Sequence, residues 1–196
     1  MNKTFPLRRT LAAFMIAGAG VMAGGCSSTT TTPTSESHHA DRREINQGVD
    51  AALAHLYETA PAARAVGNQA KAILVFPSVY QAGLIVGGEY GRGALRVNGV
   101  TERYYSIAAG SVGWQIGAQS KGIILMFMND DALNRFRASN GWQIGADATV
   151  SVATIGANGQ LDTSLAQKSV VGFVTTNAGL MAGVSLEGAK VSSIQP

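Results

Sequence analysis

Apolar residues recur every three or four positions from Asp41 to Glu58, which predicts an amphipathic helix with one apolar face. Asp41 stands before the first apolar position and is expected to cap this helix, with Glu44 three residues later completing a capping box. Pro61 then ends the helix or starts a second one that runs through Asn68. The apolar positions are Ile45, Val49, Ala52, Leu53 and Leu56.

This predicted helix has two interpretations. In the first, its apolar face packs against one side of a sheet. In the second, the helix docks on a membrane surface, with Arg42 and Arg43 near its start touching lipid phosphates. The apolar face contains no tryptophan or phenylalanine, which favours packing against a sheet.

After Lys71 the pattern changes to short runs of apolar and β-branched residues, punctuated by glycine. Runs of this kind predict strands. Residue pairs typical of turns separate several of them, namely Pro77-Ser78, Asn98-Gly99 and Asn158-Gly159. The predicted strands are 72–76, 82–90, 94–97, 104–109, 112–118, 122–128, 144–152, 170–175 and 180–186.

One predicted helix interrupts the strands. It covers residues 129–138, is capped by Asn129 or Asp130, and turns Leu133 and Phe136 inward. Many strands with short turns, and no alternation of strand and helix, predict an α+β fold with a strongly curved antiparallel sheet or barrel-like core. The N-terminal amphipathic helix and the inserted short helix flank that core. Glycines within the strands allow the sheet to bend.

The first 25 residues have the organisation of a signal peptide. Basic residues up to Arg9 precede an apolar run from 11 to 23 that is too short to span a bilayer. Small residues then lead into Cys26, the single cysteine of the chain. This order resembles a bacterial lipobox, which implies that Cys26 is diacylated and becomes the first mature residue. The alternative is an ordinary secretion signal that leaves a free thiol.

The residue after the cysteine and the segment that follows it extend this picture. Ser27 resembles the outer-membrane sorting pattern, so we expect an exported protein that is lipid-anchored in the outer membrane and faces the periplasm or the cell surface. Residues 26–40 are Ser/Thr-rich and are expected to form a flexible tether. The folded domain is then 41–196. His38 and His39 have no partner ligand at a fixed spacing, so no metal site is expected.

Composition narrows the class of protein. Of the 196 residues, 46% are hydrophobic and 14% are charged, which excludes a disordered chain. A single cysteine excludes a disulfide framework and a Cys-cluster metal site. Three of the 15 basic residues lie in the signal segment, and the remaining twelve balance twelve acidic residues. A globally basic nucleic-acid-binding protein is therefore not expected.

The predicted domain lacks the common catalytic motifs. Its single histidine, His55, lies on the predicted helix, and no Gly-x-Ser-x-Gly motif occurs, so a nucleophilic triad is not expected. The glycine run 87–93 lacks the spacing and the Lys-Ser/Thr pair of a phosphate-binding loop. We therefore expect neither an enzyme nor a cofactor.

A thin set of cations remains in the β-rich part of the chain. Arg92 and Arg96 are four positions apart in a predicted strand and therefore point to the same face. Arg103 follows across the Asn98-Gly99 turn and is expected to join them. Such a cluster can hold phosphate groups through charge-assisted hydrogen bonds. The alternative is a set of ordinary solvated residues; the full set is Lys71, Arg92, Arg96, Arg103 and Lys121.

Several stretches carry a family resemblance, among them Lys71–Pro77 (KAILVFP), Gly87–Gly93 (GGEYGRG), Ser111–Ser120, Met126–Asn129 and Gly179–Gly188. In this order, and within residues 41–195, they resemble the SYLF domain of the Ysc84 family. The resemblance implies a lipid-binding module, because eukaryotic members bind phosphoinositides; one yeast member also binds actin. Lys71 and Arg92 fall inside the matched motifs and Lys121 directly follows one.

From these patterns we expect a non-catalytic cell-envelope lipoprotein, tethered through Cys26, whose SYLF-like domain binds phospholipids with anionic headgroups. The alternative is a structural envelope protein whose β domain docks another envelope component. Salt distinguishes the two, because ionic strength weakens electrostatic contacts far more than a packed interface. The residues expected to touch headgroups are Arg42, Arg43, Lys71, Arg92, Arg96, Arg103 and Lys121.

Overall fold

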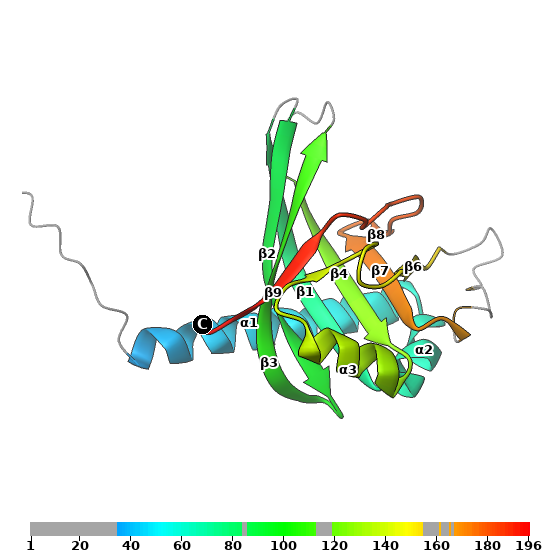
Figure 1. The fold of residues 1–196 in the computed structure, drawn as a ribbon, viewed down its shortest axis with the longest axis horizontal. Coiled ribbons are helices and arrows are strands. Elements are labelled where there is room, and N and C mark those ends of the chain that lie inside the picture. The colour runs from blue at the N-terminus through cyan, green and yellow to red at the C-terminus, as the bar shows by residue number, and fades with distance from the viewer. Residues whose placement is uncertain (1–34, 84–85, 113–118, 155–160, 162–164, 166) are drawn as a thin grey trace, which may run out of the picture. The chain divides into compact units, whose positions relative to one another are not determined.

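The N-terminal helix of the domain is longer than predicted. The computed structural model describes residues 35–83, 86–112, 119–154, 161, 165 and 167–196 (Figure 1). Helix α1 (Ser35–Thr59) is followed by the short helix α2 (Ala63–Gln69), so the predicted break at Pro61 is confirmed. The predicted helix start at Asp41 is wrong, because residues 35–40 contain no glycine or proline and continue the helix.

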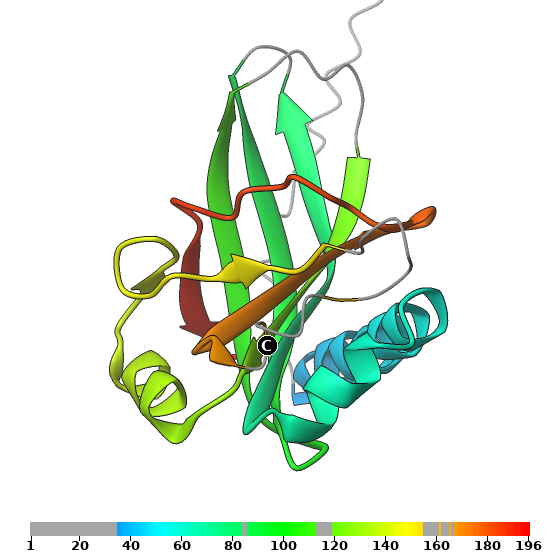
Figure 2. The same ribbon diagram turned by 90° about the vertical axis from the view of Figure 1, so that its right-hand side faces the viewer.

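The described strands form one strongly curled sheet with a half-barrel shape, which confirms the α+β prediction (Figures 1 and 2). Its order is β5-β9-β3-β2-β1-β4-β7-β6, with β8 paired to β7. All pairs are antiparallel except β6 with β7, so the sheet is mixed. The bounds are β1 (Ala72–Gly83), β2 (Val86–Val97), β3 (Val100–Val112), β4 (Gln119–Phe127), β5 (Trp142–Gln143), β6 (Ser151–Val152), β7 (Val170–Thr176), β8 (Gly179–Leu180) and β9 (Lys190–Ile194).

The predicted turns have different outcomes. Asn98 and Gly99 form the tight turn between β2 and β3, and both have positive φ, at 52° and 81°. The turn predicted at Pro77-Ser78 is wrong, because β1 continues through it with a bulge toward both neighbouring strands. A bulge accommodates a proline inside a strand because the missing N–H has no ladder partner to lose. The turn predicted at Asn158-Gly159 lies outside the described residues.

The C-terminal strands differ most from the prediction. The strands predicted at 144–152 and 180–186 are mainly loops, and only residues 151–152 and 180 lie in strands, β6 and β8. Strand β9, which the sequence did not predict, pairs with β3. Only one side chain of β9, Val191, is buried, so its sequence carries little apolar alternation. Most of the strand predicted at 112–118 lies outside the described residues.

Each face of the sheet is covered by different elements. Helices α1 and α2 cover one face, which we call the helix face, and α3 (Asp130–Ala138) lies against the opposite, inner face (Figure 2). Asn129 caps α3 by accepting a hydrogen bond of 2.9 Å from the Ala132 amide, as predicted. The strands alternate accordingly: Val75 and Ala94 belong to the cluster under α1, whereas neighbouring Leu74 and Leu95 belong to the inner cluster.

One glycine allows β1 and β2 to approach closely beside the bulge. A Cβ atom at Gly93 would lie 2.0 Å from the Val75 carbonyl oxygen. We expect Gly93→Ala to lower the free energy of unfolding by about 3 kcal/mol, because the backbones must separate. Urea unfolding of residues 27–196 measures this. Gly110→Ala in β3 is the control, with no heavy atom within 4 Å of its new methyl group; equal losses in both variants would contradict the prediction.

Candidate functional site

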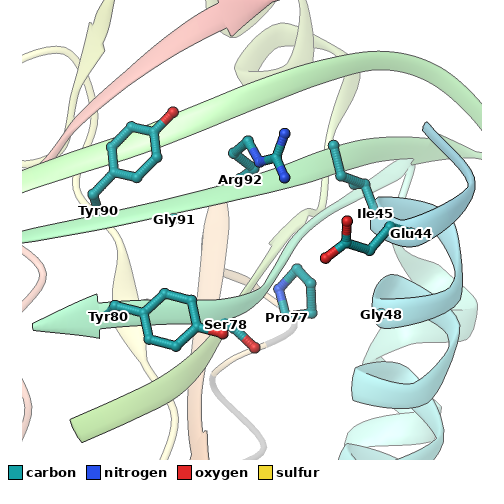
Figure 3. Close-up of a pocket in the computed structure, with 9 residues that line it drawn as sticks. All are labelled: Glu44, Ile45, Gly48, Pro77, Ser78, Tyr80, Tyr90, Gly91 and Arg92. Atoms are coloured by element: carbon teal, nitrogen blue, oxygen red, sulfur yellow. The ribbon is translucent and has the colours of Figure 1, made fainter. Parts of the chain in front are cut away.

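A pocket opens on the helix face, between the N-terminal half of α1 and strands β1 and β2 (Figure 3). Its volume is about 260 Å³. Two glycines bring its walls together: a Cβ atom at Gly48 would lie 2.9 Å from the Pro77 ring, and one at Gly91 would lie 2.8 Å from the Ser78 carbonyl oxygen. We call it the Tyr–Arg pocket; it is lined by Glu44, Ile45, Gly48, Pro77, Ser78, Tyr80, Tyr90, Gly91 and Arg92.

Two tyrosines form the outer wall of the Tyr–Arg pocket. Tyr80 in β1 and Tyr90 in β2 are directly opposite each other in the antiparallel register. Their exposed fractions are 62% and 53%, and the only other large hydrophobic residue exposed in the described part of the chain is Val100, beyond the β2–β3 turn. Cross-strand aromatic pairs are usually part of a packed face. This pair is uncovered because β1 and β2 extend beyond α1 (Figure 1).

Arg92 supplies the positive charge of the pocket. Its Nη1 lies 3.3 Å from Oδ2 of Asp41 on α1, and the arginine side chain is 36% exposed. Glu44, one turn further along the helix, directs its carboxylate into the same space (Figure 3). The described residues provide no recorded ion-pair or hydrogen-bond partner for the Glu44 side chain. The pocket therefore combines one guanidinium with the Glu44 carboxylate, and Asp41 lies outside its lining as the ion-pair partner of Arg92.

Arg96 has a different environment from Arg92, although both point to α1 as the four-residue spacing predicts. Its guanidinium donates to Asp50 at 2.8 Å, to the Gly99 carbonyl at 2.9 Å and to the Asn46 carbonyl at 3.4 Å. The side chain is only 16% exposed. Arg96 thus joins α1 to the β2–β3 turn, and with Lys71 it lines a second pocket of about 310 Å³ further along the helix.

Arg103 does not join Arg92 and Arg96. The pairing of β2 with β3 shifts by one residue between Leu95 and Arg96, so that Arg103 lies opposite Leu95, whose side chain belongs to the inner cluster. A bulge reverses the face of every residue beyond it, which the spacing along the chain does not reveal. The predicted cluster of three arginines is therefore wrong. Arg103 instead lies beside Tyr105. Burial raises the pKa of the Tyr105 hydroxyl above its ordinary value, and the positive charge of Arg103 offsets part of this rise.

The other predicted cations are distributed over the domain. Lys71 lies 3.6 Å from Asp130. Lys121 forms a largely buried ion pair of 2.9 Å with Glu89. Arg42 donates to the Pro196 carbonyl at 3.1 Å and Arg43 to the His39 carbonyl at 3.3 Å.

Carboxylates thus face four of these cations, namely Lys71, Arg92, Arg96 and Lys121. Arg42 and Arg43 donate to backbone carbonyls, and Arg103 lies beside Tyr105. The four ion pairs carry no surplus positive charge for selecting headgroups with a net negative charge. Cys26 lies outside the described residues.

Sequence reasoning missed most of the residues of the Tyr–Arg pocket. Tyr80 and Tyr90 are ten positions apart in separate strands, and only the β1–β2 register places them together. Asp41 and Glu44 were expected as helix caps, whereas both lie on the helical surface that faces Arg92. The available signal was the Gly87–Gly93 motif, which contains Tyr90 and Arg92.

Comparison with known proteins agrees with this fold. Residues 108–195, from β3 to β9, match the model of the Ysc84 family, described as Las17-binding protein actin regulator. This match bears out the resemblance to the Ysc84 (SYLF) family that the motifs carry, over slightly less than half of the chain. The family has lipid-binding and protein-binding roles. No curated protein matches the chain.

Two further observations describe the chemistry that the described residues provide. None of the described helices contains a stretch long and apolar enough to cross a membrane. No group of three or more His, Cys, Asp or Glu side chains in these ranges is placed to hold a metal ion. His55 contacts the Thr176 carbonyl through Nε2 at 2.9 Å and so joins α1 to β7.

The different environments of the two arginines lead to a testable difference in stability. Arg96→Gln is expected to lower the free energy of unfolding by about 2 kcal/mol, because it removes three hydrogen bonds from a largely buried guanidinium. Arg92→Gln is expected to cost less than about 1 kcal/mol, because an exposed ion pair contributes little. Urea unfolding of residues 27–196 compares the variants. A larger loss for Arg92→Gln would assign the structural role to Arg92 instead.

Proposed function

We propose that this chain is a non-catalytic cell-envelope lipoprotein whose SYLF domain binds phospholipid at a membrane surface. The observation that carries the proposal is the exposed Tyr80–Tyr90 pair beside the Arg92 guanidinium. Tyrosine has an apolar ring and a polar tip, and it is enriched where membranes meet water. A guanidinium binds phosphate oxygens through charge-assisted hydrogen bonds. The Tyr–Arg pocket therefore offers both chemistries that a phospholipid surface requires.

Access of a phosphate to Arg92 needs little rearrangement. The ion pair with Asp41 is long, at 3.3 Å, and both side chains are partly exposed. Exchange of the carboxylate for a phosphate therefore costs about 1 kcal/mol or less before the new bonds form. Arg96 does not take this role, because its bonds to Asp50 and two carbonyls stabilise the position of α1.

The acyl anchor and the pocket act together in this proposal. A single lipid-bearing signal gives reversible membrane binding, and a second surface contact makes it persistent. An acylated Cys26 holds the domain at a high effective concentration near lipid, so that even a weak headgroup contact is occupied. We place the protein in the outer membrane, facing the periplasm or the cell surface, because Ser27 follows the cysteine.

A second candidate function uses the same surface. Tyrosine and arginine are enriched at protein–protein interfaces, so the Tyr80–Tyr90 pair also suits a docking site for another envelope protein. Such an interface buries the tyrosines against side chains, and it does not require lipid. Binding to protein-free vesicles therefore discriminates between the two functions.

The tyrosine pair provides the direct test of membrane binding. We expect residues 27–196 to co-sediment with phospholipid vesicles, and the double variant Tyr80→Ser with Tyr90→Ser to bind about tenfold less tightly. A tenfold change in affinity corresponds to about 1.4 kcal/mol, and the loss of two interfacial rings is expected to cost more binding free energy than this. Val100→Ser is the matched control, because it removes a similarly exposed apolar side chain at the start of β3, away from the pocket.

Two outcomes of this measurement would count against the proposal. Equal losses for Val100→Ser and the tyrosine variant would show that exposed apolar area alone drives vesicle binding. No binding of the unmodified sequence to any vesicle would favour the protein-docking function.

The anchor is tested at the cysteine. Mass spectrometry of the mature protein is expected to find a diacylglyceryl group on an N-terminal Cys26, and Cys26→Ser is expected to move the protein from the membrane fraction to the soluble fraction. Ser27→Ala is the control, because it leaves the acylated thiol in place. An unmodified cysteine in the mature chain would contradict the lipid anchor, but it would not bear on headgroup binding at the Tyr–Arg pocket.

A further inference from the structure

The charges of the Tyr–Arg pocket are mixed, and this restricts the headgroup. Arg92 enters from β2 and Glu44 from α1, while Asp41 on α1 borders the pocket as the ion-pair partner of Arg92. Figure 3 shows the Arg92 guanidinium and the Glu44 carboxylate extending into the same space from opposite walls. A headgroup with only negative charge gains one contact at Arg92 and is repelled by two carboxylates. The pocket therefore disfavours a purely anionic ligand.

A ligand with both charges satisfies every group in the pocket. Its phosphate binds Arg92 in place of Asp41. Its ammonium group then donates to Glu44, which gains a cation, and to the released Asp41, which regains one. The rings of Tyr80 and Tyr90 border the same space and can stabilise an ammonium group through cation–π contact.

The volume is consistent with a small zwitterionic headgroup. About 260 Å³ corresponds to eight or nine water-sized groups of about 30 Å³ each. A phosphoethanolamine group has a similar number of non-hydrogen atoms.

We propose that the Tyr–Arg pocket binds the headgroup of a phospholipid that carries a phosphate diester and a primary ammonium group. This inference rests on the proposed function and names the lipid class for its site. A primary ammonium has three N–H donors for the carboxylates, whereas a quaternary ammonium has none. The pocket thus discriminates phosphoethanolamine from phosphocholine as well as from phosphoglycerol.

Vesicles of three compositions test this selectivity with residues 27–196. We expect binding to vesicles of phosphatidylcholine with phosphatidylethanolamine to be about fivefold tighter than to phosphatidylcholine alone. We expect replacement of the ethanolamine lipid by phosphatidylglycerol to give no such increase. Glu44→Gln should remove most of the preference, because it removes the unpaired carboxylate. Glu58→Gln, at an exposed position on the same helix, is the matched control and should retain it.

A soluble headgroup separates pocket binding from general attraction to a membrane. O-phosphoethanolamine is expected to shift the NMR signals of Tyr80 and Tyr90, and glycerol 1-phosphate at the same concentration is expected to shift them less. Arg92→Gln should weaken the response to both compounds, while Glu44→Gln should weaken only the first. Equal shifts from both compounds would overturn the inference.

The vesicle outcomes distinguish the two proposals. Binding to all three compositions without preference, or a preference for phosphatidylglycerol, overturns the choice of headgroup and leaves membrane binding intact. Failure to bind any vesicle overturns the proposed function itself. An ethanolamine preference that survives Glu44→Gln but is lost in Glu58→Gln overturns the assignment to this pocket.

Discussion

Apolar packing holds α1 on the helix face of the sheet, and this packing sets the geometry of the candidate site. Ile45, Val49 and Leu56 are buried there, and each contributes about 1.5–3 kcal/mol relative to an exposed side chain. The exposed ion pair between Arg92 and Asp41 contributes at most about 1 kcal/mol. Apolar burial therefore keeps the helix on the sheet, and the arginines of β2 define its position along that strand. The walls of the Tyr–Arg pocket exist only because the helix lies there.

The candidate site lies where this cover ends. Strands β1 and β2 continue past α1, so Tyr80 and Tyr90 occupy positions that would be core if the helix reached them (Figures 1 and 3). Gly48 and Gly91 allow close approach at the boundary, which brings helix carboxylates next to a strand arginine. Because the covering helix ends here, the surface exposes aromatic rings next to groups of both positive and negative charge. This combination suits the region where lipid headgroups meet water better than either bulk water or a protein core.

Charge in this protein is used mainly in pairs. Arg96 joins α1 to the β2–β3 turn, and Lys121 with Glu89 forms an ion pair on the inner face. Such pairs place several cations of the described domain next to acidic partners. The two arginines of β2 differ in this respect: Arg92 has one partly exposed ion pair with Asp41, whereas Arg96 is largely buried and donates to three groups. In the proposed site, selectivity depends on Glu44 as much as on any cation.

Features that depend on neighbours along the chain could be predicted from the sequence. They are the periodicity of α1, the break at Pro61, the Asn98-Gly99 turn, the capped helix α3 and the alternation of the long strands. Local motifs also carried the resemblance to the Ysc84 family, which the match over residues 108–195 bears out. Contacts between distant segments set which residues of these elements come together. A bulge moved Arg103 to the opposite face, a strand register brought Tyr80 to Tyr90, and β9 formed by pairing with a strand some 85 residues earlier in the chain. Register and bulges depend on contacts between distant segments, and a shift of one residue exchanges the two faces of a strand. The pocket therefore forms only through the register of the strands and the packing of α1, although its residues can all be read in the sequence.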